Sequence, residues 1–427
     1  MRRSVLLPAT TAAAIAAILP GCTLERVQPE GEPRVTLVFG IAGDPVEQAT
    51  YGKLAAAFEE RNPDIEVTLR HVPTRFEDKM QTEMAGGTAP DVMFFQDEYF
   101  PMFAAKNAFL DLTPYIEEDN MDLSDFFEQG IVEFSYQGRL HGFPRDWGAN
   151  VIFYNKDLFD QAGVPHPDED WTWDDFLDAA TRLTRDNDAD GRVDQYGFVI
   201  STTVHYGLPW VWAAGGEVLN EDRTECTIFS PESVAGLQVY VDYMLKHKVA
   251  PSPMQTETLD VTAMFMTGRL AMYNGGPFAV PQYRTIEDFE WDVAFLPKGP
   301  RGRVTRYYGD GYVAWRETEH PREAWEFLKF LTSEYCERLY AEDARGIPSR
   351  KSVAYSEDFI RPDTPWDERI FVDSAKYAHL QPITTRYPEM DVAWREPYER
   401  ILLGELTVAE ALEIMDHQLD ELLAEAG

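Results

Sequence analysis

The sequence predicts an α/β fold in which a parallel sheet is flanked by helices. Strand-type and helix-type segments alternate between residues 34 and 95, and this order is typical of βαβ units with right-handed crossovers. Amphipathic helices with recognisable caps occupy much of the remaining chain. About 400 residues follow an apolar leader, which is enough for two domains of ordinary size.

The first residues are predicted to be a secretory signal. Arg2 and Arg3 form a positive n-region, an apolar and Ala-rich stretch follows, and Gly21 precedes Cys22. Residues 1–21 therefore form a predicted signal peptide of the lipoprotein type, with Cys22 as the lipidated N-terminus. Plain secretion with cleavage nearby is the alternative. Residues 22–33 are polar, contain Pro and Gly, and suit a tether.

The first predicted βαβ unit begins at Arg34. The segment "RVTLVFG" is a strand of the buried type, and "IEVTLR" alternates apolar and polar residues as a half-buried strand does. The helix between them carries Leu54 and Phe58 four residues apart and ends at Pro63.

A second helix and a third strand extend this pattern. Phe76, Met80 and Met84 share one stripe of the helix, which stops at a Gly pair, and "DVMFF" follows as a strand. Ligands of parallel sheets bind beyond the carboxyl ends of the strands. Two loops leave those ends, one with Asp44 and the other with Asp97 and Glu98.

The middle and C-terminal parts are predicted to be mainly helical. Helices are expected to start at Asn155, at Thr172, at Ser230 and near Pro321. Asp175 lies three residues after Thr172, close to a capping box. The segment "TVAEALEIMDHQLDELLAEA" is predicted to be the final helix.

Composition excludes some classes of function. The formal net charge of −36 argues against nucleic acid, which requires clustered Lys and Arg, and against a basic patch for anionic lipid. Hydrophobic residues make up 44% of the chain, so a large core is available. Beyond the leader, Cys226 and Cys336 are the remaining cysteines, and the sequence leaves open whether they pair.

One acidic stretch resembles part of a calcium loop. Its calcium-type carboxylates are Asp186, Asp188, Asp190 and Asp194. Position twelve, which should carry a bidentate Glu, is Gly197. Asp and Asn also favour turns through local hydrogen bonds, so a metal-free turn is the preferred interpretation. A structural calcium site completed by a distant acid is the alternative.

Several segments together resemble the extracellular solute-binding proteins of ABC importers, in the family-1 group that includes maltose-binding protein. They are spread over nearly the whole mature chain. These segments are "GTAPDVMFF", "GRLHGFPRDWGANVIFYNKDLFDQAGV", "WTWDDFLDAATRLT", "DQYGF", "MFMTGRLAMYNGGPF", "FLPKGP", "HPREAWEFLKFLTSE" and "GIPSRKSV".

The resemblance implies a two-lobed periplasmic-binding-protein fold of type II. Each lobe would be a mainly parallel sheet flanked by helices, with a hinge between the lobes. The implied N-terminal lobe is 34–144 plus 273–313, and the C-terminal lobe is 145–272 plus 314–427. Crossing segments are expected near Phe143–Gly148, Ala271–Asn274 and Gly311–Trp315. Ligand contacts to both lobes would drive closure.

The resemblance also implies a carbohydrate site between the lobes. Carboxylates and amides bind sugar hydroxyls, and aromatic rings cover the C–H faces. The chain carries 10 Trp, 20 Tyr and 25 Phe, many of them in loops. By motif position, the ligand-binding residues would be Asp44, Phe95, Asp97, Glu98, Trp147, His205, Tyr206, Trp210, Asn274, Gly276, Phe278, Tyr308, Asp310, Trp394 and Arg395. A core position is an equal alternative for Trp210.

The function implied by the resemblance is an extracytoplasmic receptor that captures a mono- or oligosaccharide and delivers it to an ABC permease. The receptor would be a membrane-anchored monomer in the periplasm or at the cell surface, without a cofactor. Two alternatives stay open, an extracellular carbohydrate-active enzyme and a ligand-presenting sensory receptor. No Gly-x-Ser-x-Gly elbow, His-Glu-x-x-His pair or phosphate loop is present in the sequence.

Overall fold

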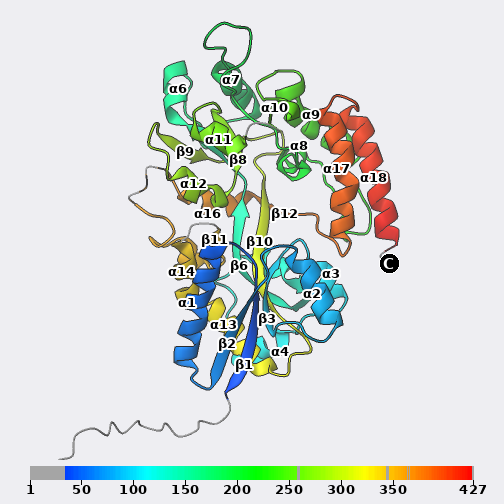
Figure 1. The fold of residues 1–427 in the computed structure, drawn as a ribbon. Helices are drawn as coiled ribbons and strands as arrows, with labels where there is room; N and C mark the ends of the chain where they lie inside the picture. Colours follow the sequence, from blue (N-terminus) through cyan, green and yellow to red (C-terminus); the bar gives the residue numbers. More distant parts are fainter. Residues whose placement is uncertain (1–33, 257–259, 343–345, 363, 365, 426–427) are drawn as a thin grey trace, which may run out of the picture.

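The chain folds into two lobes joined by long strands (Figure 1). The computed structural model describes residues 34–256, 260–342, 346–362, 364 and 366–425. The predicted signal peptide, the tether and Cys22 lie outside the described residues. The N-terminal lobe is the lower one in Figure 1, and the C-terminal lobe lies above it.

The N-terminal lobe is built on a mixed sheet with the order β11-β6-β10-β3-β1-β2. Strands β1, β2 and β3 are parallel, with Val35 opposite Ile65 and Phe39 opposite Val92, so the predicted βαβαβ order is confirmed. Strand β10 enters antiparallel between β3 and β6. The strands are β1 (Val35–Ile41), β2 (Ile65–His71), β3 (Val92–Gln96), β6 (Gly142–Ala149), β10 (Thr305–Ala314) and β11 (Ile347–Pro348).

Local sequence fixes where the first helix begins. Helix α1 (Pro45–Arg61) follows β1, and Asp44 is its N-cap, accepting hydrogen bonds from the N–H groups of Val46 at 2.8 Å and Glu47 at 3.1 Å. The Glu47 side chain bonds back to the Asp44 N–H, which completes a capping box. This cap places the start of α1 at the carboxyl end of β1.

Other helices of this lobe cover both faces of the sheet. Phe327 of α13 packs on Phe39 of β1, with ring centroids 5.1 Å apart, and on Phe58 of α1 at 4.8 Å. The expected placement of residues 314–341 in the C-terminal lobe is therefore wrong, because α13 and α14 contribute to the N-terminal core. The helices are α2 (Phe76–Ala85), α3 (Phe100–Ala105), α4 (Thr113–Asp119), α5 (Glu128–Glu133), α13 (Pro321–Leu331) and α14 (Glu334–Ala341).

The C-terminal lobe contains a small sheet with the order β8-β7-β9. Strands β8 (Met272–Gly275) and β9 (Trp291–Ala294) pair antiparallel with β7 (Val151–Asn155). The expected placement of these two strands in the N-terminal lobe is therefore wrong, and so is the expected crossing at Ala271–Asn274. Backbone pairing with β7 holds this segment inside the C-terminal lobe.

Helices surround this small sheet. The capping boxes at Thr172 and Thr407 and the N-caps at Asn155 and Ser230 are formed. The two longest helices of this lobe, α17 and α18, lie side by side at one edge (Figure 1). The helices are α6 (Lys156–Ala162), α7 (Trp173–Leu183), α8 (Leu208–Ala214), α9 (Pro231–Leu245), α10 (Pro253–Thr256), α11 (Val261–Met266), α12 (Val280–Tyr283), α17 (Tyr387–Leu402) and α18 (Val408–Ala424).

Three stretches connect the lobes. Strand β6 leads through Asn150 directly into β7, and β10 returns to the N-terminal sheet. The expected crossing at Gly311–Trp315 lies too far along β10, because residues 311–314 already pair with β3. The third stretch runs from β11 through α15 (Lys351–Ala354), α16 (Arg369–Asp373) and β12 (Ala378–Leu380) to α17.

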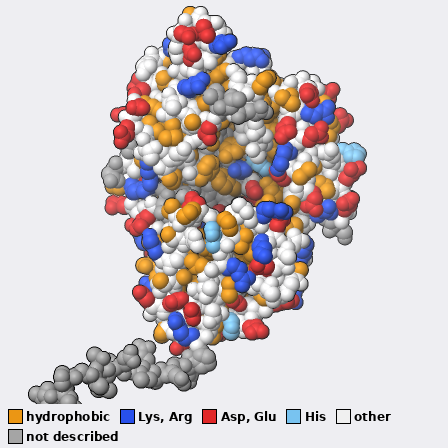
Figure 2. Space-filling model, in the orientation of Figure 1, with side chains coloured by type: hydrophobic (Ala, Val, Ile, Leu, Met, Phe, Trp, Pro, Cys, Tyr) orange, Lys and Arg blue, Asp and Glu red, His pale blue; other side chains and the backbone are white. Residues whose placement is uncertain are grey.

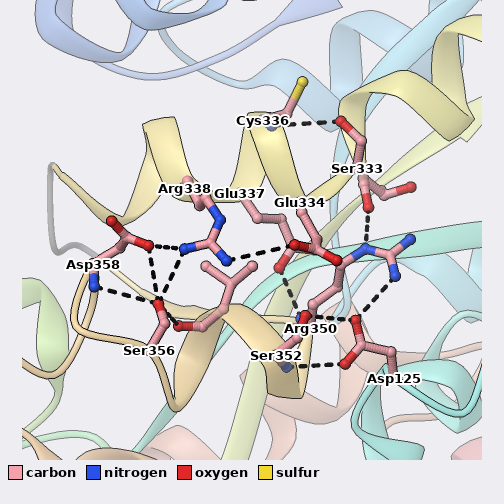
Figure 3. Close-up of polar contacts among 12 residues, drawn as sticks. Asp125, Ser333, Glu334, Cys336, Glu337, Arg338, Arg350, Ser352, Ser356 and Asp358 are labelled. Carbon is pink, nitrogen blue, oxygen red and sulfur yellow. Dashed lines mark hydrogen bonds and ion pairs between the residues drawn. The ribbon is translucent and has the colours of Figure 1, made fainter.

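The third stretch is fixed to the N-terminal lobe by the polar network of Figure 3. Asp125 accepts hydrogen bonds from Arg350 Nη1 at 3.1 Å and Ser352 Oγ at 2.8 Å. The buried Glu337 accepts from the Arg350 N–H at 2.7 Å, and burial raises the pKa of Glu337 to about 8. These bonds set the start of the stretch before it reaches the other lobe.

The packing answers the question of whether the two cysteines pair. Cys226 and Cys336 are both free and buried, and they lie in the separate cores of the C-terminal and N-terminal lobes. Among the described residues, no helix combines the length and the apolar character needed to cross a membrane.

Candidate functional site

The molecule is hollowed where the two lobes meet (Figure 2). One cavity of about 680 Å³ is lined from both sides of this junction. Asp97 and Glu133 come from the N-terminal lobe, whereas Arg223 and Thr384 come from the C-terminal lobe. A ligand held here would contact both lobes at once.

Asp97 forms one end of the floor, directly after β3. Its carboxylate Oδ2 accepts the Gly309 N–H at 2.9 Å and faces Gln381 Nε2 at 3.5 Å. The residue is 4% exposed, and burial, together with the adjacent Glu98, raises the pKa of Asp97 to about 7. The predicted pair Asp97 and Glu98 thus stands at the carboxyl end of a strand, as the parallel sheet requires.

Glu133 at the end of α5 is a second carboxyl group beside Asp97. Both of its carboxylate oxygens are buried and make no hydrogen bond within the described part of the chain. Burial raises the pKa of Glu133 well above its usual range, and the charge of Asp97 adds to this rise. Arg223 on the opposite lobe is held by the Ile383 carbonyl at 2.7 Å.

Arg306 of β10 links the strand to the C-terminal lobe. Its guanidinium lies 4.4 Å from the ring centroid of Tyr308 and 5.4 Å from that of Tyr206. Arg306 Nη1 also donates to Gln381 Oε1 at 3.3 Å. A planar cation between tyrosine rings holds both rings in place, so Arg306 organises the predicted residues Tyr206 and Tyr308.

An aromatic and ionic cluster in the C-terminal lobe is built around His205. His205 Nε2 lies 3.6 Å from Asp391 Oδ1 and 3.3 Å from the Tyr387 hydroxyl, and its ring packs on Trp394. Burial lowers the pKa of His205, and the hydrogen bond with His205 contributes most to lowering the pKa of Asp391 to about 2. Arg395 pairs with Asp391. The predicted residues His205, Trp394 and Arg395 are thus brought together.

The Tyr387 ring of this cluster meets the Tyr99 ring of the N-terminal lobe, with centroids 6.4 Å apart. The two tyrosines follow β3 and begin α17, respectively. The contact therefore bridges the two lobes beside Asp97 and Glu98.

A third group of predicted residues lies where β8 approaches β10. Asn274 accepts from Asn150 Nδ2 at 2.9 Å and donates to the Tyr206 carbonyl at 3.4 Å. A Cβ on Gly276 would lie 1.9 Å from the Tyr308 hydroxyl, so this close approach requires glycine. Phe278 follows with 47% of its surface exposed.

Asp310 belongs to a separate ionic cluster in the N-terminal lobe. Its carboxylate accepts from Arg145 Nη2 at 2.9 Å, and Arg145 also bonds Asp146 at 2.9 Å. Glu47 of the α1 capping box lies 3.9 Å from the same guanidinium. Asp44 and Asp310 are therefore connected through Glu47 and Arg145.

Four of the predicted ligand-binding aromatics are core residues, and one of them is Trp394, which is 0% exposed in the core of the C-terminal lobe. Phe95 is fully buried and packs on Phe103 and Phe109, because strand alternation turns it toward the helices. Trp210 is 1% exposed, and its ring centroid lies 4.7 Å from that of Tyr240. Of the two alternatives for Trp210, a ligand contact or a core position, the structure favours the core position.

Trp147 is the fourth of these core residues. Its ring is stacked on Tyr307 at 5.1 Å and is 1% exposed. The predicted ligand contacts Phe95, Trp147, Trp210 and Trp394 therefore lie in the packed interior and not in the lining of the cavity between the lobes.

Several residues at the junction escaped the sequence analysis. They are Tyr99, Glu133, Arg223, Arg306, Gln381, Tyr387 and Asp391. The position of Arg306 could have been predicted, because it lies two residues before Tyr308 in a strand, and such residues share one face of the sheet. The other six residues come from segments that are far apart in the sequence, and these segments are brought together only by the arrangement of the two lobes.

The acidic stretch forms a surface turn in the C-terminal lobe. Carboxylate oxygens of Asp186, Asp188 and Asp194 lie within 4.8 Å of one another. Asp186 accepts the Gly191 N–H at 2.8 Å, and Asp194 accepts the Asn187 N–H at 2.8 Å. Both hydrogen bonds are local to the turn, as Asp side chains favour, and the spacing of the three carboxylates is also compatible with a metal ion.

Comparison with known proteins identifies the family. A family model described as bacterial extracellular solute-binding protein matches residues 42–334. The chain belongs to this family. Family membership confirms the resemblance and the two-lobed fold, and it implies a location outside the cytoplasm.

Solved structures and a curated relative agree with this assignment. This solute-binding protein is 28% identical to the ABC substrate-binding protein Lmo0181 of Listeria monocytogenes in complex with cycloalternan, with a TM-score of 0.81 over 92% of this chain and 99% of that chain. For maltose-bound MalE3 of T. maritima the identity is 27% and the TM-score 0.75, over 91% and 100% of the two chains. The maltodextrin-binding protein MdxE of Bacillus subtilis is 22% identical over 79% of this chain and 78% of its own length.

Proposed function

We propose that this solute-binding protein is the receptor of an ABC importer and captures a saccharide between its lobes. Residues from both lobes meet around Arg306, where two tyrosine rings, the Gln381 amide and the Asp97 carboxyl group converge. This convergence is the observation that carries the proposal. Cycloalternan and maltose in the related structures support a saccharide as the ligand class.

The chemistry of these groups suits a sugar. Carboxylate and amide oxygens accept hydrogen bonds from hydroxyl groups, and tyrosine rings cover the flat C–H faces of a pyranose. Because the groups belong to both lobes, a bound sugar stabilises the arrangement in which the lobes are close. A closed, loaded receptor would then deliver the sugar, chemically intact, to the permease.

Membrane attachment belongs to the same proposal. Lipidation at Cys22 would keep the receptor beside its permease, and the polar residues 22–33 would provide reach for docking. We propose that the receptor acts as a monomer and without a cofactor.

The test is a screen of the purified mature protein against saccharides, followed by calorimetry. Maltose, maltotriose, melibiose, raffinose and arabinotriose serve as probes. We expect at least one to raise the melting temperature, because a ligand at 100 times its Kd stabilises by about 2.7 kcal/mol. Saturable heat must accompany this shift, and chromatography must recover the sugar unchanged.

Two substitutions sharpen this test. Arg306→Ala removes the cation between Tyr206 and Tyr308 and should weaken the affinity at least about tenfold, which is 1.4 kcal/mol. Arg316→Ala, on the exposed surface, should bind as the parent does. Cleaved products would favour the carbohydrate-active enzyme, and the lack of any shift across the panel would refute the saccharide assignment.

A further inference from the structure

An acid of one lobe and an arginine of the other line the same cavity without a hydrogen bond between them. Glu133 ends α5 in the N-terminal lobe, and Arg223 lies between α8 and α9 in the C-terminal lobe. The Arg223 guanidinium donates to the Ile383 carbonyl at 2.7 Å instead. The two charges act on each other, because Arg223 opposes the rise in the pKa of Glu133. The groups are therefore close enough to interact electrostatically across the cavity.

Glu133 occupies a position that disfavours its charge. Both carboxylate oxygens are buried, and no N–H or hydroxyl group of the described residues donates to them. The C-terminal end of a helix carries a partial negative charge, which also repels a carboxylate. Burial raises the pKa of Glu133 well above its usual range, so that the protonated form is favoured in this arrangement. A cation that reached the group would offset this penalty.

The other groups that face Glu133 do not supply such a cation. Asp97 and Glu98 follow β3 and raise the pKa of Glu133 further. The buried Tyr307 hydroxyl of β10 is another neighbour, and burial raises its pKa well above the usual range, so it is neutral. The remaining titratable groups of the cavity lining are Tyr136, Asp222 and Arg223. Arg223 is thus the one cation among the described residues that line this cavity.

The backbone around Arg223 presents its side chain at a cost. Arg223 has a φ of 56°, in the left-handed region that a residue with a side chain seldom adopts. Asn220 holds this turn, since its Oδ1 accepts the N–H groups of Thr224 at 2.8 Å and Glu225 at 3.2 Å. The arginine is exposed, so packing does not explain its position. A strained backbone that carries an exposed arginine beside a buried acid points to a function for the side chain.

We propose that Glu133 and Arg223 form an ion pair when the lobes close on a ligand, and that capture of the saccharide releases the proton of Glu133. The inference rests on the proposed saccharide function and adds a latch to it. The O–H bond of Glu133 breaks, its proton passes to the solvent, and the carboxylate accepts N–H bonds from the guanidinium. Because the partners belong to opposite lobes, their ion pair stabilises the closed arrangement.

The direction of the pH dependence follows from this exchange. The ligand-free protein holds a proton on Glu133 that the closed protein lacks, so linkage requires the affinity for the ligand to rise with pH. The rise begins near the pKa of Glu133 in the closed state, which Arg223 lowers. It ends near the raised pKa of Glu133 in the ligand-free state.

Calorimetry in two buffers counts the released protons. The mature protein is titrated at pH 7, in phosphate and in Tris, with those sugars among maltose, maltotriose, melibiose, raffinose and arabinotriose that bind it. The difference in heat between the buffers gives the number of protons. We expect about half a proton to one proton, and an affinity that rises about three- to tenfold per pH unit between pH 6 and pH 8. Binding that depends on neither the buffer nor the pH would overturn the latch.

Variants assign the proton to Glu133, because Asp97, with a pKa of about 7, titrates in the same range. Glu133→Gln mimics the protonated acid, so it should bind as the parent does at pH 5.5 and about tenfold more weakly at pH 8. Arg223→Gln should lose a similar factor at pH 8, and Arg223→Lys should restore part of it. Glu128→Gln, at the exposed start of α5, is the matched control and should keep the parental pH profile.

The outcomes separate the latch from the proposed function. The double variant Glu133→Gln with Arg223→Gln should lose no more affinity than either single variant, because the two residues act as a pair. If no saccharide binds the parent protein, the proposed function fails and the latch falls with it. If saccharides bind but the proton release survives in both Glu133→Gln and Arg223→Gln, the latch is refuted while the proposed function stands. Circular dichroism and melting temperature confirm that each variant is folded.

Discussion

Asp97 shows how one side chain serves both the fold and the site. Its carboxylate accepts the Gly309 N–H of β10 and faces Gln381, which directly follows β12. The same position removes the group from water and puts it next to Glu98 and Glu133, so that the ionised form is disfavoured. A carboxyl group that keeps its proton near neutral pH can donate a hydrogen bond as well as accept one.

This pKa predicts how stability depends on pH. An unfolded Asp titrates near about 3.9, whereas the pKa of Asp97 in the folded protein is raised to about 7. Between these values the folded state binds more protons, so the contribution of Asp97 to stability falls as the pH rises from about 4 to about 7. Asp97→Asn should therefore raise the free energy of unfolding at pH 8 by about 1–3 kcal/mol, with little gain near pH 4.

Urea unfolding at pH 4 and at pH 8 measures this difference. Asp64→Asn on the exposed surface is the matched control and should show no such growing gain. An Asp97→Asn variant that is less stable at pH 8, or equally changed at both values, would contradict the assignment of Asp97 as a strained, buried acid.

At the scale of elements, β10 is central to the molecule. Residues 310–314 of β10 pair with β3, residues 307–313 pair with β6, and residues 305–307 pair with β12. Alternation along this strand turns Arg306 and Tyr308 toward one face and Tyr307 and Gly309 toward the other. The first face meets Tyr206 and β8, and the second holds Trp147, whereas Asp97 is bonded by the backbone N–H of Gly309.

The contact between β8 and β10 allows a specific prediction. Gly276 has an extended backbone, yet a Cβ there would lie 1.9 Å from the Tyr308 hydroxyl. Gly276→Ala should therefore displace Tyr308, destabilise the protein by about 1–3 kcal/mol and weaken saccharide binding. Calorimetric melting and titration measure the two effects.

Gly52→Ala provides the comparison for this substitution. Gly52 lies inside α1, its nearest neighbour to an added Cβ is 4.0 Å away, and alanine favours helix by up to about 1 kcal/mol. This variant should be as stable as the parent or more stable. If Gly276→Ala behaved like Gly52→Ala, the tight packing of Tyr308 on β8 would not be a constraint on the site.

For the whole molecule, the arrangement of connections allows relative motion of the lobes. Each lobe has its own core, and β6, β10 and the stretch around β11 and β12 join the lobes. A third core cluster, which includes Trp147, Phe153 and Tyr307, lies along these connections. Groups on the two sides of the cleft meet through side chains, as Tyr99 and Tyr387 do. A hinge between rigid lobes fits this arrangement.

Ligand-driven closure is testable in solution. Saturation with a binding saccharide should reduce the radius of gyration from small-angle X-ray scattering by on the order of 1 Å, from roughly 21 Å for a compact chain of this length. The Arg306→Ala variant at the same sugar concentration should compact less, because fewer sites are filled. Calorimetric saturation without any change in the scattering curve would show that the lobes do not close on the ligand.

The local parts of this protein could be read from its sequence. The βαβαβ order at the start of the chain follows from the spacing of apolar residues. The helix caps at Asp44, Thr172 and Thr407 depend on residues within four positions of one another. The loops with Asp44, Asp97 and Glu98 could be placed because parallel strands direct their carboxyl ends to one edge. The family resemblance supplied the two lobes.

Tertiary structure alone decided which distant segments meet. Pairing with β7 assigns β8 and β9 to the C-terminal lobe, and packing on β1 assigns α13 to the N-terminal lobe, although neither is visible in local periodicity. The tertiary structure also decided which of the predicted aromatic residues are buried. Phe95, Trp147 and Trp210 lie in the interior, whereas Tyr206 and Tyr308 surround Arg306. Burial depends on what covers a side chain, and that is set by contacts between residues far apart in the chain.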